Sequence, residues 1–354
     1  MKQILITGGC GFIGSNLAIA LKKSIKNTNI IAFDNLSRKG SEINRRSFKR
    51  HNIEFIKGDI RYCRSLEFGK KNISLIIECA AEPSVLAGYN ESPAYAIDTN
   101  LNGVINCLHL AKKHRCPMIF LSTSRVYPYP LLNQIRLNKL ASRFTINNKQ
   151  SIRGVTLKGI STNFPMEGIR SLYGATKYCS ELLINEFCNM YNLKAVINRC
   201  SVVAGSGQWG KVDQGVFSYW MINHYFKRKL SYIGYGGQGK QVRDCLHVED
   251  LAALILYQIK HMNSLNGKTF NVGGGIKRSS SLKELTSMCQ SITGNKVPIN
   301  RILKTREADI PLFISDNSKV ERETSWKPEH SVEEILNDIF HWIKNNEKQI
   351  KKLT

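Results

Sequence analysis

An apolar run that leads straight into closely spaced glycines constrains this chain more than any other feature. Residues 4–14 read Ile-Leu-Ile-Thr-Gly-Gly-Cys-Gly-Phe-Ile-Gly, and a helical pattern follows at 16–22. In a strand–turn–helix unit, Gly8 and Gly11 let the backbone turn tightly and approach a pyrophosphate, which the helix N-terminus attracts. Gly14 allows the helix to pack closely on the strand. The pattern predicts a dinucleotide-binding βαβ unit at the start of the chain.

Acidic residues follow the next two predicted strands. The apolar run 30–33 ends in Asp34, at the roughly twenty-residue spacing expected of a carboxylate that binds the ribose hydroxyls. Asp34 would repel a 2′-phosphate, which favours NAD over NADP, although Arg38 keeps NADP as the alternative. Asp59, after the run 53–56, is a candidate contact to the adenine, with a plain turn former as the alternative.

Strand and helix patterns alternate along the first half of the chain. Apolar runs at 75–81 and 117–122 flank a long helical pattern at 100–113. Such alternation predicts an α/β fold with a Rossmann-type doubly wound parallel sheet. We expect a cofactor-binding domain at 1–200, to which some later segments return, and a smaller C-terminal α/β substrate-binding lobe at 201–354.

The remaining segments are less regular. Residues 128–168 carry prolines, glycines and basic residues, which is long for a loop and is interpreted as a candidate lid with local helix. The lobe after residue 200 is punctuated by glycines and ends in helical patterns at 281–292 and 332–343.

The composition combines an ordinary apolar content with a strongly basic balance. The chain has 51 Lys and Arg against 27 Asp and Glu, a net charge of +24, but these residues are spread along it without a nucleic-acid-binding motif. We therefore expect a solvated basic surface and no nucleic-acid partner. No apolar run approaches the length of a membrane span, and the first strand leaves no room for a signal peptide. The ten scattered cysteines, without a CxxC pair, favour reduced thiols in the cytoplasm and no metal site.

Tyr173 and Lys177 are the candidate catalytic pair. Their spacing of four residues places both on one face of a helix, and an ammonium beside a phenol lowers the pKa of that phenol. A phenolate near neutral pH can take the proton of a sugar hydroxyl. Thr123, at the end of an apolar strand, could hydrogen-bond the same hydroxyl. A solvated helix face for the pair and a strand cap for Thr123 are the alternatives.

These residues resemble the motifs of the extended short-chain dehydrogenase/reductase family of nucleotide-sugar epimerases and dehydratases. The GxxGxxG turn matches residues 8–14, the Ser/Thr strand end matches Thr123, four residues before Tyr127, and YxxxK matches 173–177. Four further stretches look like the subgroup of CDP-paratose 2-epimerases, at 34–40, 124–127, 210–217 and 232–251. The resemblance runs over nearly the whole chain.

The resemblance implies a tightly held NAD+ that removes a hydride from carbon 2 of a CDP-linked deoxysugar and returns it to the opposite face. Tyr173 would be the base, Lys177 would lower its pKa and hold the nicotinamide ribose, and Thr123 would orient the hydroxyl. The protein is then expected to form a homo-oligomer, a dimer or a tetramer, as the family does.

The resemblance also implies two sets of ligand contacts. The cofactor contacts are Gly8, Gly11, Phe12, Ile13, Gly14, Asp34, Asn35, Ser37, Arg38, Asp59, Ile60, Ala80, Ala81, Asn100, Tyr173 and Lys177. The substrate contacts are Ser84, Ser124, Arg125, Gln214, Val216, Tyr232, Arg243 and Arg306. Arg243 would bind the diphosphate, which suits a bidentate guanidinium, and structural pairing with Asp244 or Asp250 is its alternative.

Departures from the family pattern leave other substrates open. Pro128 replaces a usual glycine, the segment after it is longer than is typical, and Glu82 stands where the subgroup has a neutral amide. A 4-epimerase stays open because the same Tyr, Lys and Thr serve it. A 4,6-dehydratase is disfavoured because Ser124 and Arg125 occupy the places of the acid pair that expels water. A cofactor-sensing or RNA-binding protein that kept the fold is the remaining alternative.

Overall fold

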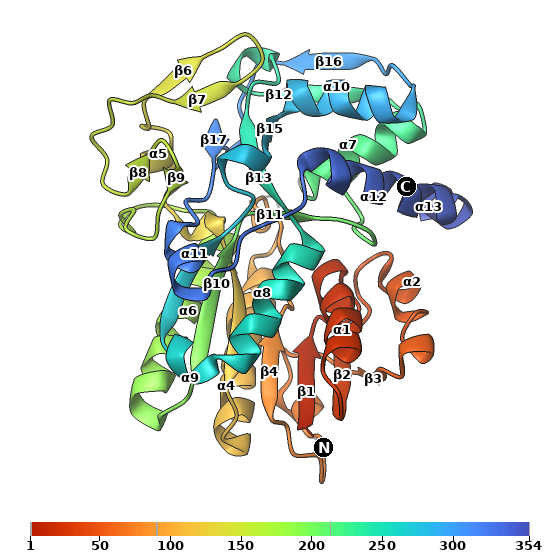
Figure 1. Ribbon diagram of the computed structural model, residues 1–354, viewed down its shortest axis with the longest axis vertical. Coiled ribbons are helices and arrows are strands. Elements are labelled where there is room, and N and C mark those ends of the chain that lie inside the picture. The colour runs from red at the N-terminus through yellow and green to blue at the C-terminus, as the bar shows by residue number, and fades with distance from the viewer. Residues whose placement is uncertain (1, 90, 213, 354) are drawn as a thin grey trace. The chain divides into compact units, whose positions relative to one another are not determined.

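The computed structural model describes residues 2–89, 91–212 and 214–353 (Figure 1). The chain divides into two compact units. Unit 1 contains Met1–Val126, Leu172–Arg199 and Leu251–Phe270, and unit 2 contains Tyr127–Ser171, Cys200–Asp250 and Asn271–Thr354. The sequence-based division at residue 200 therefore grouped 127–171 with the first domain, whereas these residues cluster with unit 2.

A seven-stranded sheet forms the centre of unit 1, with the strand order β14-β10-β5-β4-β1-β2-β3. β1 pairs in parallel with β2 and with β4. The pairs β2–β3 and β4–β5 are parallel as well. The strands are β1 (Lys2–Thr7), β2 (Thr28–Asp34), β3 (Glu54–Lys57), β4 (Leu75–Glu78), β5 (Met118–Thr123), β10 (Ala195–Cys200) and β14 (Lys268–Val272). The predicted doubly wound parallel sheet is confirmed.

The central strands are apolar on both sides because helices pack on both. Leu5 and Phe33 belong to a core cluster that includes residues of α4 and α6, while Ile4 and Ile6, on the other face of β1, are also buried. α1 packs against β1 and β2. The helices lying wholly or mostly in this unit are α1 (Phe12–Ser24), α2 (Ser41–Arg45), α3 (Ala94–Ile97), α4 (Gly103–His114), α6 (Leu172–Tyr191), α8 (Val248–Lys260) and α9 (Met262–Leu265).

The parallel strands bring their last residues to one edge of the sheet. β1, β2, β4 and β5 end at Thr7, Asp34, Glu78 and Thr123, and Thr7 lies beside Glu78 in the register. Starting from β1, the chain adds β2 and β3 on one side of the sheet and then β4 and β5 on the other side, so the topological switch point lies between β1 and β4. Ligands of open α/β sheets bind outside the carboxyl ends of the strands at such a switch point. The fold therefore places several predicted site residues where a dinucleotide is expected.

Unit 2 is organised around β13 (Val242–His247). This strand pairs with β11 (Val202–Ala204), β15 (Ser279–Ser281) and β17 (Leu312–Phe313), and a separate parallel pair joins β12 (Leu230–Ile233) to β16 (Ile299–Ile302). After residue 200, the helices that lie wholly in this unit are α7 (Val216–Tyr225), α10 (Leu282–Thr293), α11 (Ser318–Thr324), α12 (Val332–Asn345) and α13 (Glu347–Leu353). α10 and α12 confirm the helices predicted at 281–292 and 332–343.

The segment after Tyr127 is more ordered than the sequence analysis expected. It forms α5 (Tyr129–Leu132), the hairpin of β6 (Leu137–Lys139) with β7 (Phe144–Ile146), and the hairpin of β8 (Val155–Thr156) with β9 (Gly159–Ile160). The buried Tyr127 hydroxyl donates to Oδ1 of Asn271 at 2.6 Å, and Nδ2 of Asn271 donates to the Ile160 carbonyl at 2.7 Å. Asn271 thus connects the start of the segment to its strand β9.

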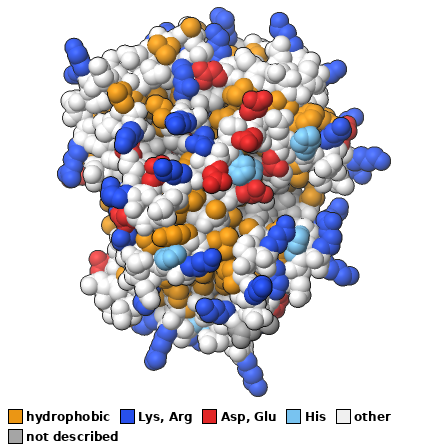
Figure 2. Space-filling view, in the orientation of Figure 1, with side chains coloured by type: hydrophobic (Ala, Val, Ile, Leu, Met, Phe, Trp, Pro, Cys, Tyr) orange, Lys and Arg blue, Asp and Glu red, His pale blue; other side chains and the backbone are white. Residues whose placement is uncertain are grey.

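The charged side chains do not gather in one patch on the visible face. Figure 2 shows Lys and Arg scattered over this face with Asp and Glu between them. This distribution fits a solvated basic surface better than a continuous site for a polyanion. Among the described residues, no helix combines the length and apolarity that a membrane crossing requires.

Tyr127→Phe is predicted to destabilise the protein by about 1–3 kcal/mol, because it leaves the buried Oδ1 of Asn271 without this donor. Denaturant unfolding measures the loss, and hydrogen exchange should show faster exchange at the Ile160 amide. Tyr62→Phe, at a tyrosine that is 60% exposed, is the control and should change neither. Equal stability of the Tyr127 variant and the wild type would contradict this account of the segment.

Candidate active site

The glycine turn joins β1 to α1. Gly8 has a φ of +61°, and Gly11 is the N-cap of α1, whose first residues are Phe12 and Ile13. A Cβ on Gly14 would lie 2.2 Å from the carbonyl oxygen of Gly8, so only glycine fits this close approach. Because the N-cap has no side chain to bond the first amides of α1, the turn suits an anionic phosphate.

Asp34 connects the end of β2 to the glycine turn. Its carboxylate accepts the Leu36 N–H at 2.7 Å and the Cys10 N–H at 3.0 Å. Burial raises the pKa of the Asp34 carboxyl, while these backbone donors and the charge of Arg38 act in the opposite direction. Nδ2 of Asn44 donates to the Cys10 carbonyl at 3.2 Å and holds the turn from its other side. The predicted ribose contact therefore also shapes the turn.

Asp59 and Asn35 form a second polar group beside the same edge. Nδ2 of Asn35 donates to Asp59 at 2.9 Å, and the Arg61 guanidinium donates to the same carboxylate at 2.7–3.1 Å. Burial opposes ionisation, but these donors outweigh it and hold the pKa of Asp59 below its usual value. Oδ1 of Asn35 accepts the Ser37 N–H, and the Ile60 carbonyl accepts from Asn106.

The loop after β4 is braced by Asn100. The Asn100 side chain donates to the Glu82 carbonyl at 2.9 Å and accepts the Glu82 N–H at 2.8 Å. The Glu82 carboxylate accepts the Ser84 N–H at 3.1 Å, so the loop folds on its own polar groups. Ala80 and Ala81 lie in this loop, where a Cβ on the first glycine of the turn would come within 2.8 Å of the Ala80 Cα.

The three candidate catalytic residues come from β5 and α6. Thr123 is the last residue of β5 and is buried, and its Oγ1 accepts the Arg125 N–H at 3.2 Å. That bond uses a lone pair and leaves the hydroxyl proton available for donation. Tyr173 and Lys177 lie one turn apart in α6. Ser124 and Arg125 begin the short 3₁₀ turn after Thr123.

Glu78 is a charged residue of this region that the sequence analysis missed. It is the last residue of β4 and is completely buried, and its Oε2 lies 3.2 Å from Nζ of Lys177. A carboxylate at the end of an apolar strand could have indicated a buried ion pair, because a buried charge requires a partner. The partner lies 99 positions away in the sequence, so the spacing of residues does not reveal it.

Five predicted substrate contacts lie in unit 2, and Arg243 is the best defined of them. Its guanidinium pairs with Oδ1 of Asp309 at 3.1 Å and donates to the Ile310 carbonyl at 2.8 Å. The expected alternative pairing with Asp244 or Asp250 is wrong: Asp244 accepts from Ser201 and two backbone amides, and Asp250 pairs with His330.

Gln214 and Val216 lie at the start of α7, and Arg306 belongs to a loop that contacts the residues just before it. Val216 is the first residue of α7, and Gln214 lies just before its N-cap. Nη1 of Arg306 donates to the Val212 carbonyl at 3.3 Å, which brings its loop against the one that leads into α7. Asp213, part of the same sequence motif, lies outside the described residues.

Tyr232 is engaged inside unit 2. Its hydroxyl donates to Oγ1 of Thr286 at 2.8 Å, and its ring stacks parallel to that of Trp220 at 6.4 Å. A Cβ on Gly239 would lie 2.9 Å from the ring, so Gly239 is packed against it. These contacts give Tyr232 a packing role within unit 2, in addition to its proposed contact with the nucleotide.

His247, Glu249 and His330 bring potential metal-ligand atoms within 4.8 Å of one another. Both nitrogens of His247 are engaged, Nδ1 with the Glu249 N–H at 3.2 Å and Nε2 with Asp338 at 3.3 Å. His330 bonds Asp250 at 2.8 Å, and the two imidazole rings stack with centroids 4.2 Å apart. These hydrogen bonds already engage both nitrogens of His247 and Nδ1 of His330, so the arrangement favours a hydrogen-bonded network over a metal site.

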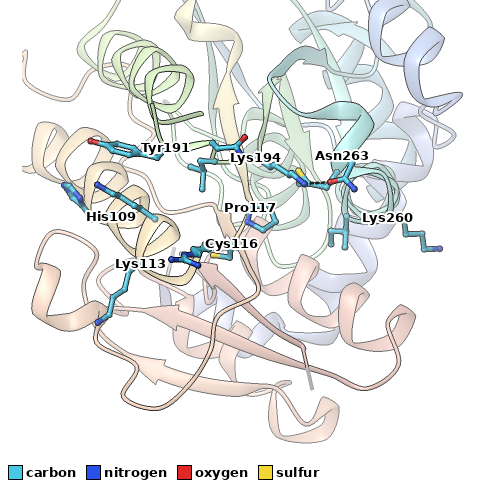
Figure 3. Close-up of a pocket in the computed structure, with 14 residues that line it drawn as sticks. His109, Lys113, Cys116, Pro117, Tyr191, Lys194, Lys260 and Asn263 are labelled. Carbon is cyan, nitrogen blue, oxygen red and sulfur yellow. Dashed lines mark hydrogen bonds between the residues drawn. The ribbon is translucent and has the colours of Figure 1, made fainter. Parts of the chain in front are cut away.

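A cavity of about 1040 Å³ lies at the opposite edge of the sheet in unit 1 (Figure 3). It is lined by residues 116–117, just before β5, and 193–194, just before β10, so it lies at the amino ends of the strands. Its lining is basic, with Lys112, Lys113, Arg115, Lys194 and Lys260. None of the predicted site residues lines this cavity.

Comparison with known proteins identifies the chain's relatives. The NAD dependent epimerase/dehydratase family matches residues 4–273. The CDP-paratose 2-epimerase of Salmonella typhi is 30% identical over 96% of this chain and 98% of its own. A bifunctional UDP-glucose and UDP-xylose 4-epimerase of Pisum sativum is 28% identical over 98% and 96%. The crystal structure of UDP-glucose 4-epimerase from Thermotoga maritima with UDP-glucose superposes with a TM-score of 0.77, at 25% identity over 98% and 99%.

Gly14→Ala is predicted to weaken NAD binding by at least about tenfold, because the new Cβ would collide with the Gly8 carbonyl and displace the turn. Calorimetric titration with NAD+ measures the effect. Gly294→Ala, a strained substitution with open space at the C-cap of α10, controls for general destabilisation and should leave binding unchanged. Equal affinities of the Gly14 variant and the wild type would remove the turn from the cofactor site.

Proposed function

Because this chain belongs to the NAD dependent epimerase/dehydratase family, we propose that it inverts carbon 2 of a CDP-linked deoxysugar. The reaction converts CDP-paratose to CDP-tyvelose through a 2-keto sugar. One observation carries this choice of substrate: the 30% identity to a CDP-paratose 2-epimerase extends over 96% of the chain, so it includes both units.

Tyr173 is the proposed base. Lys177 lies one turn further along α6, where its ammonium stabilises the phenolate and lowers the pKa of the phenol. Tyr173 takes the proton of the sugar hydroxyl as that carbon becomes a ketone, and returns the proton when the carbon is reduced on its other face. Thr123, whose Oγ1 already accepts the Arg125 N–H, donates its hydroxyl proton to the sugar oxygen and orients it.

The residues of unit 1 fit NAD. The glycine turn admits no Cβ at Gly14, which leaves room for a pyrophosphate, and Asp34 offers a carboxylate to the adenosine ribose. Lys177 would hold the nicotinamide ribose. Bound NAD+ would supply hydride transfer: the sugar carbon would lose a hydride to the cofactor and later recover it, so the reaction would have no net redox change. The chain's part is to bind, to orient and to move the proton.

Arg243 is the proposed diphosphate ligand. Its planar guanidinium matches two phosphate oxygens, as it now matches Asp309 and the Ile310 carbonyl. A diphosphate would therefore compete with Asp309 for the same donors. Arg306, which donates to the Val212 carbonyl, is the second proposed substrate-binding arginine of unit 2.

A nucleotide-sugar 4-epimerase is the alternative, supported by 28% identity to the Pisum sativum 4-epimerase over nearly the whole chain. The proposed base chemistry is the same at carbon 4. A 4,6-dehydratase has less support, because neither Ser124 nor Arg125 can act as the acid that expels water.

Incubation with CDP-paratose and, separately, with UDP-glucose separates these activities. NMR should show CDP-tyvelose from the first and no product from the second. Turnover of UDP-glucose alone would replace the proposal by its alternative, and failure to convert any nucleotide sugar would favour a cofactor-sensing role.

Tyr173→Phe is predicted to lower kcat by about 10²–10⁴-fold with little change in NAD binding, because it removes the proton acceptor but keeps the ring. Steady-state turnover of CDP-paratose measures the loss. Tyr191→Phe, at the exposed end of α6, is the matched control and should retain full activity. Retained turnover in the Tyr173 variant would exclude it as the base.

Arg243→Lys is predicted to raise KM for the nucleotide sugar by about tenfold with kcat nearly unchanged, because it keeps the charge and loses the bidentate fork. Comparison with Arg45→Lys, at an arginine whose ion pair with Glu42 on α2 is largely exposed, controls for the loss of a guanidinium. A KM equal to that of the wild type would remove Arg243 from the substrate site.

A further inference from the structure

The ammonium of Lys177 faces a buried carboxylate. Oε2 of Glu78 lies 3.2 Å from Nζ, and the side chains of Glu78 and Lys177 are 0% and 2% exposed. This is hydrogen-bond distance for a charged pair. An ion pair that is so well shielded from water cannot be treated as a weak surface contact. Lys177 therefore reaches the proposed reaction with a buried carboxyl group as the partner of its ammonium.

The surroundings of the pair hold both partners in place. Oγ1 of Thr7, on the neighbouring β1, donates to Oε1 of Glu78 at 3.4 Å, and the Ala80 amide also hydrogen-bonds this carboxylate. On the side of β5, the Phe120 ring centroid lies 4.1 Å from Nζ of Lys177. The carboxylate and the ammonium are thus each fixed by a further element of the sheet.

Among the described residues, the pair has titratable neighbours on α4 and on α6. Cys107 of α4 feels both charges, but burial raises the pKa of its thiol far above the usual value, so it stays neutral. Burial raises the pKa of Glu78, while the Lys177 ammonium and the hydrogen bonds from Ala80 and Thr7 favour its ionised form. On α6, Tyr173 lies one turn before Lys177 and Glu181 one turn after it, and Glu181 is paired with Arg199 of β10 at 2.7 Å.

We infer that Glu78 is a positioning residue, which holds the Lys177 ammonium and offsets part of its charge, and thereby tunes the acidity of the Tyr173–Lys177 pair. The inference rests on the proposed base role of Tyr173. A bare ammonium would lower the proton affinity of the phenol strongly. An ammonium that shares its charge with Glu78 lowers it less, so the phenolate keeps enough basicity to take a sugar proton.

The direction of the effect follows from the charges alone. Replacing Glu78 by Gln removes one negative charge beside the Tyr173–Lys177 pair. Loss of the first proton from the pair then becomes easier, because the remaining charge is more positive. Since the phenolate form is the active base, the acid limb of kcat/KM is expected to move to lower pH.

The test compares the pH profiles of the wild type, Glu78→Gln and Glu78→Asp. The acid limb of kcat/KM should move down by about 1 pH unit in the Gln variant. It should move less, in the same direction, in the Asp variant, whose charge is retained but lies further from the ammonium. The Asp variant also serves if the Gln variant does not fold. An unmoved limb in either folded variant, or a limb moved to higher pH, overturns the inference.

Glu181→Gln is the matched control. Glu181 is a second buried carboxylate of unit 1, on α6, but it pairs with Arg199 at 2.7 Å rather than with Lys177. Its substitution should cost stability, as judged by denaturant unfolding, without moving the acid limb. A shift equal to that of Glu78→Gln would mean that any lost buried carboxylate produces it, and would also overturn the inference.

A substrate-free titration separates this inference from the proposed function. Tyrosinate absorbance is measured against pH with and without Tyr173→Phe, in the wild-type and Glu78→Gln backgrounds, and the difference within each background reports ionisation of Tyr173. The transition should occur at lower pH with Glu78→Gln even if the substrate has been assigned wrongly. An unmoved transition in an enzyme that converts CDP-paratose would end the inference and leave the proposed function standing.

Discussion

The shared carboxyl edge of the parallel sheet is the constraint on which the site of unit 1 depends. Thr7, Asp34, Glu78 and Thr123 each end a strand, and the parallel pairing of these strands brings all four ends to one edge. The glycine turn follows the first of them and is held by the second through the Cys10 amide. The proposed cofactor contacts and the proposed proton chemistry therefore rely on the same edge of the sheet.

The second requirement is the management of buried charge. α6 carries Lys177 and Glu181, and each is paired with a buried partner, Glu78 on β4 and Arg199 on β10. Burial makes an unpaired charge costly, so each pair also fixes the position of α6 against the strands. In unit 2, Asp309 gives Arg243 an anionic partner that a diphosphate could replace. In each unit, a basic residue that is proposed to contact a ligand is therefore already paired with a carboxylate of the protein: Lys177 in unit 1 and Arg243 in unit 2.

Short sequence patterns were sufficient to predict those parts of the candidate site that one strand, turn or helix forms by itself. The glycine turn, the strand that ends in Thr123 and the helix that carries Tyr173 and Lys177 all follow from short periodic patterns, and the structure places them as predicted. The roles of these residues remain proposals. The Glu78–Lys177 and Arg243–Asp309 pairs could not be predicted in this way, because their partners lie 99 and 66 positions apart.

The segment 127–171 shows the same limit. Its prolines and glycines read as an irregular lid, because hairpins with strands of two or three residues leave almost no periodic pattern. Its order comes from unit 2, through Asn271 and the Ile314 carbonyl, which accepts the Ile160 N–H at 2.8 Å. Those partners lie more than a hundred positions along the chain, beyond the reach of local sequence patterns.

In the proposed reaction, the hydrogen of the sugar carbon leaves and returns without exchange with water, while Tyr173 carries only the hydroxyl proton. CDP-paratose labelled with deuterium at carbon 2 tests this most directly, with the product analysed by NMR and mass spectrometry. Hydride transfer within the site should give CDP-tyvelose that retains the deuterium at carbon 2. Product that carries solvent hydrogen at that carbon would contradict it.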